Sequence, residues 1–172
     1  MSDQFLSLDA DCYQRESLAL IPLYGDLFSL VDAQDADLAR FKWYRFEGNS
    51  TLYSKGKVDG KHLFLHRVIA ARMGITGLVD HKNRRGLDNR RCNLRQATHS
   101  QNTSNSGPRR NGTSGFKGVS RWGDRWQAGI KIDGRRRGLG HFFSKEEAAR
   151  AYDAAAKTLF GEFAYLNFPE AP

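Results

Sequence analysis

Short apolar runs separated by Gly, Asp and Asn dominate the first part of the chain. They lie at residues 18–32 and 39–66, and apolar and polar side chains alternate within them. With turn signals at Gly48–Asn49 and Asp59–Gly60, this alternation predicts antiparallel strands that each bury one face. Residues 66–74 instead have the spacing of a short helix that ends at Gly74.

The last third of the chain has a clearer strand pattern. Residues 116–122 and 125–132 alternate as two strands across a Gly-Asp turn, and an Asp-Gly pair then leads into a third strand over 135–143. In the middle strand one face is predicted to be core and the other to face solvent. The core positions are Trp126, Ala128, Ile130 and Ile132, and the outer positions are Arg125, Gln127, Gly129 and Lys131.

A helix is predicted directly after this third strand. Ser144 followed by Glu147 forms a capping box, and the helix should run to Phe160 and end at Gly161. Its small side chains allow a close approach to the sheet. The stripe predicted to face the sheet is Ala148, Tyr152, Ala155 and Leu159.

These patterns predict an α+β protein, with a β-rich N-terminal region followed by a three-stranded antiparallel sheet packed on one helix. Between the two regions, Ser104–Gly115 is polar and turn-forming and has no apolar periodicity, so we place a linker within it. The predicted segments are a tail at 1–15, a first domain at 16–105, a linker at 106–115 and a second domain at 116–169.

The composition limits the number of domains and the cellular location that we expect. Its 172 residues are 40% apolar and 12% aromatic, which suits one folded domain or two small ones. No run approaches the ~18 apolar residues of a membrane helix, and residues 1–14 are acidic, unlike a signal peptide. We therefore expect a cytoplasmic protein with no membrane partner. Cys12 and Cys92 lie far apart and lack the spacing of a zinc module.

The net charge of +8 is distributed very unevenly along the chain. Residues 1–60 hold six Lys/Arg and ten Asp/Glu, a net of −4, whereas residues 61–172 hold 21 and nine, a net of +12. The excess falls between Lys82 and Arg137, which enclose 15 basic and three acidic residues. Such a cluster attracts a polyanion through counterion release, so nucleic acid is the predicted partner. The alternative is a basic surface kept for solubility.

The stretch Val79–Asn102 adds chemistry to this charge. Besides six Arg/Lys it holds Asp80, two histidines and four asparagines, which a surface that only coats DNA does not need. Hydrolysis of a phosphodiester requires a deprotonated water and positive charge on the phosphate oxygens. A histidine suits the first task, and a hard cation held by carboxylate and amide oxygens suits the second. Thr98 and Gln101 form a capping box, which predicts a helix with Asn102 in its first turns.

The segments LHRVIAARMG, VDHKNRRGLDNRRCNLR and ATHSQN resemble an HNH endonuclease of the homing type, over about residues 20–105. The resemblance implies a ββα-metal finger, in which two short strands and a helix present the site to the DNA minor groove. It also implies roles. Asp80 and Asn102 would hold Mg²⁺ or another divalent cation such as Mn²⁺, with no small-molecule cofactor. His81 would be the general base, and Asn93 would orient the His81 loop.

Other polar residues of this region have supporting or open roles. His66 matches a histidine often present in the family, and we expect it to support the site or to belong to the core. Asn89 is either a turn residue or a member of the site. The arginines of the tract are interpreted as phosphate clamps, which position a DNA strand without reading its sequence; they are Arg84, Arg85, Arg90, Arg91 and Arg95.

Residues 116–169 closely resemble the APETALA/ethylene-response-factor type of DNA-binding domain. The resemblance rests on KGV at 117–119, W-x-A-x-I-K at 126–131, LGHF at 139–142, EEAARAYDAAA at 146–156 and LNFP at 166–169. It implies that the sheet enters the DNA major groove. The family's DNA-contacting positions correspond here to Lys117, Arg121, Trp122, Lys131 and Arg136, and strand parity adds Arg125 and Gln127.

This domain departs from its family in ways that bear on the target. Ser120 replaces a usual Arg, Gly129 a usual Glu and Gly138 a usual Trp. Binding to duplex DNA is compatible with these changes. The target sequence of the plant proteins is not expected to apply.

The sequence therefore predicts a metal-dependent endonuclease for double-stranded DNA, monomeric and similar to the homing nucleases of mobile elements in phages and bacteria. The main alternative is a non-catalytic DNA-binding regulator with a degenerate HNH scaffold. The presence of Asp80, His81, Asn93 and Asn102 together argues against it. An RNA-binding protein is a weaker alternative, because the stacking aromatics of RNA modules are not evident.

Overall fold

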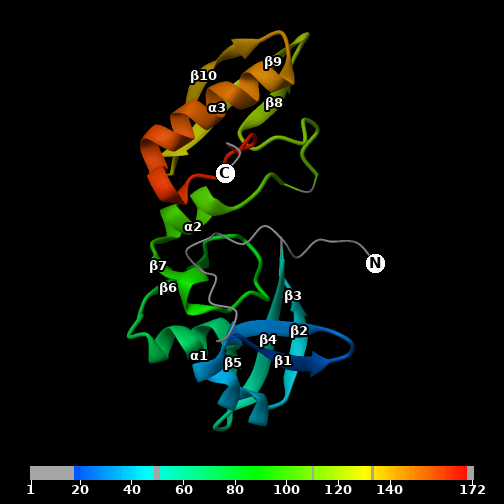
Figure 1. Ribbon diagram of the computed structural model, residues 1–172. Coiled ribbons are helices and arrows are strands. Elements are labelled where there is room, and N and C mark those ends of the chain that lie inside the picture. Colours follow the sequence, from blue (N-terminus) through cyan, green and yellow to red (C-terminus); the bar gives the residue numbers. More distant parts are fainter. Residues whose placement is uncertain (1–17, 49–50, 110, 133, 170–172) are drawn as a thin grey trace. The chain divides into compact units, whose positions relative to one another are not determined.

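The computed structural model describes residues 18–48, 51–109, 111–132 and 134–169 (Figure 1). The chain divides into two compact units, Met1–Gln96 and Ala97–Pro172. The predicted tail lies outside the described residues, as do Asn49 and Asp133 of two predicted turns.

The first unit is built on a mixed five-stranded sheet. Its order is β2-β1-β3-β4-β5, and β1 pairs with β3 in parallel while the other neighbours are antiparallel. The predicted antiparallel pairing is confirmed for β1–β2, β3–β4 and β4–β5, whereas the parallel pair β1–β3 departs from it. A 3-10 helix, Ala33–Arg40, joins β2 to β3 and returns the chain so that β3 runs with β1. The strands are β1 Leu18–Tyr24, β2 Phe28–Asp32, β3 Trp43–Glu47, β4 Leu52–Val58 and β5 Lys61–Phe64.

In the first unit, the turn at Asp59–Gly60 and the helix before Gly74 form where the local sequence predicts them. Asp59 and Gly60 both have positive φ, 47° and 81°, and connect β4 to β5 as a tight hairpin. Helix α1, Leu65–Arg72, follows β5 directly, and Gly74 adopts a φ of 78° just past its end. Two further strands, β6 Leu78–His81 and β7 Leu94–Ala97, pair in a small sheet of their own.

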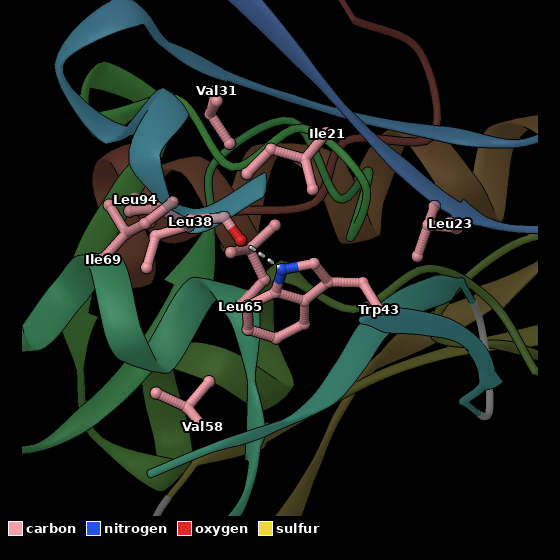
Figure 2. Close-up of a cluster of buried hydrophobic side chains, with 9 residues drawn as sticks. All are labelled: Ile21, Leu23, Val31, Leu38, Trp43, Val58, Leu65, Ile69 and Leu94. Atoms are coloured by element: carbon pink, nitrogen blue, oxygen red, sulfur yellow. Dashed lines mark hydrogen bonds between the residues drawn. The ribbon is translucent and has the colours of Figure 1, made fainter. Parts of the chain in front are cut away.

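The core of the first unit gathers around the indole ring of Trp43 (Figure 2). This side chain is only 1% exposed, and its Nε1–H donates a 2.8 Å hydrogen bond to the carbonyl oxygen of Leu38. The bond satisfies the one polar atom of a ring that is otherwise buried for its apolar surface. The other buried members of the cluster are Ile21, Leu23, Val31, Leu38, Val58, Leu65, Ile69 and Leu94.

The second unit begins with helix α2, His99–Asn105, whose Thr98–Gln101 capping box has both of its hydrogen bonds. A three-stranded antiparallel sheet follows, in the order β10-β9-β8, with helix α3 packed on it (Figure 1). Among the described residues no helix combines the length and apolar character needed to cross a membrane. The elements are β8 Val119–Trp122, β9 Arg125–Ile132, β10 Arg135–Phe142 and α3 Lys145–Phe160.

The packing of α3 confirms its predicted cap and ends but corrects its inner stripe. Ser144 and Glu147 form the capping box, and the helix ends before Gly161, which has a φ of 51°. Leu159, predicted to face the sheet, is 45% exposed. The buried stripe is Ala148, Ala149, Tyr152 and Ala156. The four core positions predicted for β9 all belong to the clusters beneath α3, as expected from strand parity.

The Trp43–Leu38 hydrogen bond gives a test of this core. Replacing Trp43 by Phe should lower the free energy of unfolding by about 0.5–1.5 kcal/mol, because the Leu38 carbonyl would lose the indole donor and keep the 3.2 Å hydrogen bond from the Phe41 N–H. Urea titration measures the change. The neighbouring Tyr44→Phe is the control, since Tyr44 is 48% exposed; an equal loss in both variants would contradict this role for the indole.

Candidate active site and nucleic-acid interface

Asp80 and His81 are the last two residues of β6, and both are buried, with exposed fractions of 4% and 6%. The Asp80 Oδ2 atom accepts a 2.9 Å hydrogen bond from Nε of Arg95 on β7. A buried carboxylate is costly unless a charged partner compensates it. Arg95 therefore both neutralises Asp80 and fixes the orientation of its carboxylate.

The imidazole of His81 is oriented by Asn89. Its Nε2 lies 3.1 Å from Asn89 Oδ1, while the Asn89 amide nitrogen donates to Ser29 Oγ at 2.5 Å. Because that amide nitrogen is directed at Ser29, the oxygen of Asn89 faces His81 and accepts a hydrogen from it. Nε2 then carries the ring proton, and the lone pair lies on Nδ1.

Burial keeps this imidazole neutral. Loss of solvent lowers the pKa of His81, and the Asn89 hydrogen bond and the carboxylates of Asp80 and Asp88 offset only part of that effect. Aromatic rings enclose it: the centroid of His66 lies 5.0 Å away and that of Tyr53 lies 5.9 Å away. A neutral imidazole with a directed lone pair is the form that accepts a proton.

Asn93 braces the loop that follows His81. Its side-chain nitrogen donates to the carbonyl oxygen of Asp88 at 2.6 Å, and its Oδ1 accepts from the backbone N–H of Asn83 at 3.0 Å. Its own carbonyl oxygen accepts from the N–H of Lys82 at 2.9 Å. The two ends of the loop are therefore tied to one buried side chain.

Strand β2 and the residue just before β4 support the same loop, although both lie far away in sequence. The Asn89 N–H donates to Leu30 O at 2.7 Å, and Gly86 N–H donates to Thr51 Oγ1 at 3.1 Å. Nothing in the sequence indicated the supporting roles of Ser29, Leu30, Thr51 and Tyr53. Ser29 and Thr51 carry no motif, and Ser29 meets Asn89 across 60 positions, so no local signal could have found them.

The arginine tract divides into buried and exposed members. Arg90 is 2% exposed and makes two hydrogen bonds to the Asp88 carboxylate, at 2.8 and 2.6 Å. The guanidinium thus lies in a buried ion pair, and its predicted phosphate contact stays a prediction. The density of charge in the sequence does not reveal that the Asp88 carboxylate, two positions away, forms an ion pair with Arg90.

Two other arginines are engaged in ion pairs. Arg91 donates to Asp35 on the 3-10 helix at 2.8 and 3.1 Å, and Arg95 pairs with Asp80. Both guanidinium groups thus take part in ion pairs within the first unit, and their predicted phosphate contacts stay predictions. Arg84 and Arg85, in contrast, are exposed in the loop between His81 and Asn89, and their predicted phosphate contacts stay predictions.

The two predicted metal ligands come from different units. Asp80 lies in the first, whereas Asn102 is exposed on α2 in the second. One carboxylate and one amide oxygen are hard donors of the kind that Mg²⁺ takes, with its remaining positions left to water and phosphate. The donor chemistry therefore fits the cation. Within the described residues no three His, Cys, Asp or Glu side chains gather as a metal site, so no His/Cys centre of the zinc type is present there.

On the outer face of the second unit, Arg136 is held across the sheet. Its Nη2 donates to Ser120 Oγ at 3.1 Å and to Gln127 Oε1 at 3.4 Å. A Cβ added at Gly129 would lie 2.7 Å from Arg136 Nε, so the guanidinium occupies the space that a side chain there would fill. Two departures from the family, Ser120 and Gly129, thus set the position of one arginine.

The remaining predicted DNA contacts fall into two groups. Arg121, Trp122, Arg125 and Lys131 are exposed, and Trp122 is 61% exposed. Lys117 differs, because its Nζ donates to the carbonyl oxygens of residues at the end of α2. The resemblance assigned Lys117 to DNA, whereas its ammonium group is taken up by backbone oxygens.

The similarity of the chain to known proteins defines its class. The chain is 30% identical over 132 residues to the uncharacterized HNH endonuclease L560 of Acanthamoeba polyphaga mimivirus, which covers 76% of this chain and 68% of that protein. The chain belongs to the HNH endonuclease family.

The second unit carries a further similarity. It is 48% identical over 64 residues to dehydration-responsive element-binding protein 2C and 52% identical over 64 residues to ethylene-responsive transcription factor ERF084, both of Arabidopsis thaliana. Each match covers 35% of this chain, but only 18% and 25% of the plant proteins. The chain thus combines an HNH region with an APETALA/ethylene-response-factor-type domain. No model of a known family matches it, and no solved structure does.

His66 gives a test of the buried ring cluster. Burial lowers its pKa from 6.5 to about 3, and its Nδ1 has no hydrogen-bond partner among the described residues. The folded-state pKa lies below the unfolded value, so this contribution to stability is complete above pH 6.5 and is lost as the pH falls toward 3. His66→Phe should remove a slope of up to about 1.4 kcal/mol per pH unit in that window.

Urea unfolding at several pH values between 4 and 7 measures that slope. The exposed His62 supplies the control His62→Phe, which should leave the wild-type slope in place. A His66→Phe curve parallel to that of the wild type would show that His66 titrates normally and is not sealed from solvent.

Proposed function

We propose that this protein is a divalent-metal-dependent endonuclease that hydrolyses phosphodiester bonds in double-stranded DNA, and that its sheet domain selects the target. The observation that carries the proposal is the buried, neutral His81 whose proton is assigned to Nε2 by Asn89. The amide that orients this ring is itself held by Ser29 Oγ and by the carbonyl oxygen of Leu30 on β2.

The residues of the first unit would divide the chemistry between them. His81 Nδ1 takes a proton from the attacking water, and Asn89 stabilises the ring tautomer that does so. Asp80 and Asn102 would hold a cation such as Mg²⁺ or Mn²⁺, which supplies positive charge to the phosphate oxygens. Arg95 keeps the Asp80 carboxylate in place, and Asn93 keeps the loop closed behind His81.

Binding of the duplex would use both units. Arg84 and Arg85 are exposed within four residues of His81 and provide phosphate contacts close to the reacting bond. In the second unit Arg136 is held in a fixed orientation, as direct reading of a guanine edge requires. The two plant relatives are named as an element-binding protein and a transcription factor, which supports duplex DNA as the partner.

The variant His81→Ala tests the proposed endonuclease activity. With Mg²⁺, the wild-type protein should nick a supercoiled plasmid that contains its bound site, and His81→Ala should reduce the rate at least ~100-fold, within the range that general bases contribute. Agarose gels report the conversion of supercoiled to open-circular DNA. A chelator should abolish nicking by the wild type.

His62→Ala is the matched control, because His62 is an exposed histidine of the same unit. If the wild type binds DNA but nicks no plasmid with either Mg²⁺ or Mn²⁺, the protein is a regulator and not a nuclease. If His81→Ala nicks at the wild-type rate, His81 is not the base.

Arg136→Ala tests the division of labour between the units. It should weaken binding of the preferred site by about 1–3 kcal/mol while slow nicking of unrelated DNA continues. Arg137→Ala is the control, since Arg137 pairs in register with the core residue Ile130 rather than with Lys131. Equal losses of specific binding and of unspecific nicking in Arg136→Ala would refute a separate recognition unit.

A further inference from the structure

Helix α2 belongs to the second unit, although the resemblance to HNH nucleases extends through it to Asn102. Its C-terminal end faces Lys117. The ammonium nitrogen of Lys117 lies 2.9 Å from the carbonyl oxygen of Thr103, 2.5 Å from that of Ser104 and 2.6 Å from that of Ser106. An ammonium group has three donors, and three backbone acceptors lie within hydrogen-bonding distance of it.

The backbone that presents Lys117 is itself fixed. Its N–H donates to Asn167 Oδ1 at 2.8 Å, and its carbonyl oxygen accepts from Asn167 Nδ2 at 3.1 Å. Asn167 is in turn held by Asp153 of α3, at 2.9 Å. The following residue, Gly118, has a φ of 78° and packs directly on the Tyr152 ring. Lys117 therefore extends toward α2 from the core of the DNA-binding domain.

A cation suits the C-terminal end of α2, where Thr103 O also accepts from the N–H and the hydroxyl of Ser106. The last carbonyl groups of a helix have no partner within it and carry the negative end of its dipole, so a cation there is stabilising. With seven residues, α2 is too short to be stable by itself. The N–H of Tyr165 adds a 3.1 Å hydrogen bond to Ser104 O, and the Tyr165 ring lies 5.6 Å beneath the Lys117 ammonium.

Helix α2 also shares a surface with the DNA-reading sheet. His99, Ser100 and Thr103 line an open groove of about 790 Å³. Lys131 and Arg136 of the sheet line the same groove. A duplex seated on the sheet would therefore have α2 along its side.

We propose that Lys117 is a positioning residue that anchors the nuclease helix α2, and with it Asn102, to the DNA-binding domain. Recognition of the target and placement of one site residue are then carried out by a single rigid unit. The effect of this anchor on DNA cleavage rests on the proposed function, whereas the anchoring of α2 itself does not.

Hydrogen exchange of the full chain tests the anchor directly. Lys117→Met removes the charge and the donors while keeping most of the length of the side chain. The amides of α2 should then exchange at least about tenfold faster, because hydrogen bonds to a charged group are lost. Amides of α3 should keep their protection. Lys117→Arg, which retains the charge and donors, should restore most of the protection of α2, and Lys157→Met, at an exposed lysine of α3, should have no effect on it.

Unchanged exchange of α2 in Lys117→Met would overturn the proposal. Should this variant lose the protection of α3 as well, Lys117→Gln provides a milder change. In Lys117→Gln, an exchange rate of the α2 amides between the rates in Lys117→Arg and Lys117→Met would then support the anchor. Exchange of these amides at the wild-type rate would refute it.

DNA binding and cleavage distinguish an anchor from a DNA contact. A lysine that neutralises a phosphate contributes about one unit to the salt dependence of binding. As an anchor, Lys117→Met should keep the wild-type salt dependence and instead slow nicking about tenfold or more through misplacement of Asn102. Loss of one unit of salt dependence with normal exchange of α2 would assign Lys117 to DNA. If the wild type never nicks DNA, the proposed function fails, while the exchange result still decides the anchor.

Discussion

The hydrogen bond from His81 to Asn89 is the constraint on which the candidate site depends. It assigns the proton of the imidazole to one nitrogen, and it does so with an acceptor that carries no charge. A carboxylate in the same place would also accept that proton but would stabilise the imidazolium and raise the pKa of His81. An amide leaves burial as the dominant effect, so the ring stays neutral.

Asn89 can fill this role because the rest of the first unit holds it still. It is fully buried, and β2 provides both a backbone acceptor for its N–H and the Ser29 hydroxyl for its side chain. The Asp88–Arg90 ion pair lies next to it and closes the loop. Buried ion pairs add little net stability, but they fix geometry, since breaking one leaves an uncompensated charge. Strand β2 of the five-stranded sheet thus supports the loop that carries Asn89.

Local patterns in the sequence were enough to predict much of the second unit. The faces of β9, the Ser144 cap and the end of α3 before Gly161 follow from periodicity and capping alone. In the first unit, the parallel pairing of β1 with β3 and the contacts of Ser29 and Thr51 with the motif loop join distant segments, which no short pattern encodes. The ion pairs of Arg90 and Arg91 depend on which carboxylates the fold brings near them. Charge counting could locate the basic tract but could not separate its structural from its exposed members.

The junction between β7 and α2 has a consequence for how such proteins can evolve. By sequence resemblance, the natural place to exchange one DNA-reading domain for another is the polar segment after Ser104. The hydrogen bonds from Lys117 and Tyr165 to the end of α2 cross that point. A recombination there would give the helix a new neighbour without a matching cation. A recombination between Gln96 and Thr98 would transfer helix α2 together with the domain that supports it. The packing therefore favours inheritance of α2 and the DNA-binding domain as one piece.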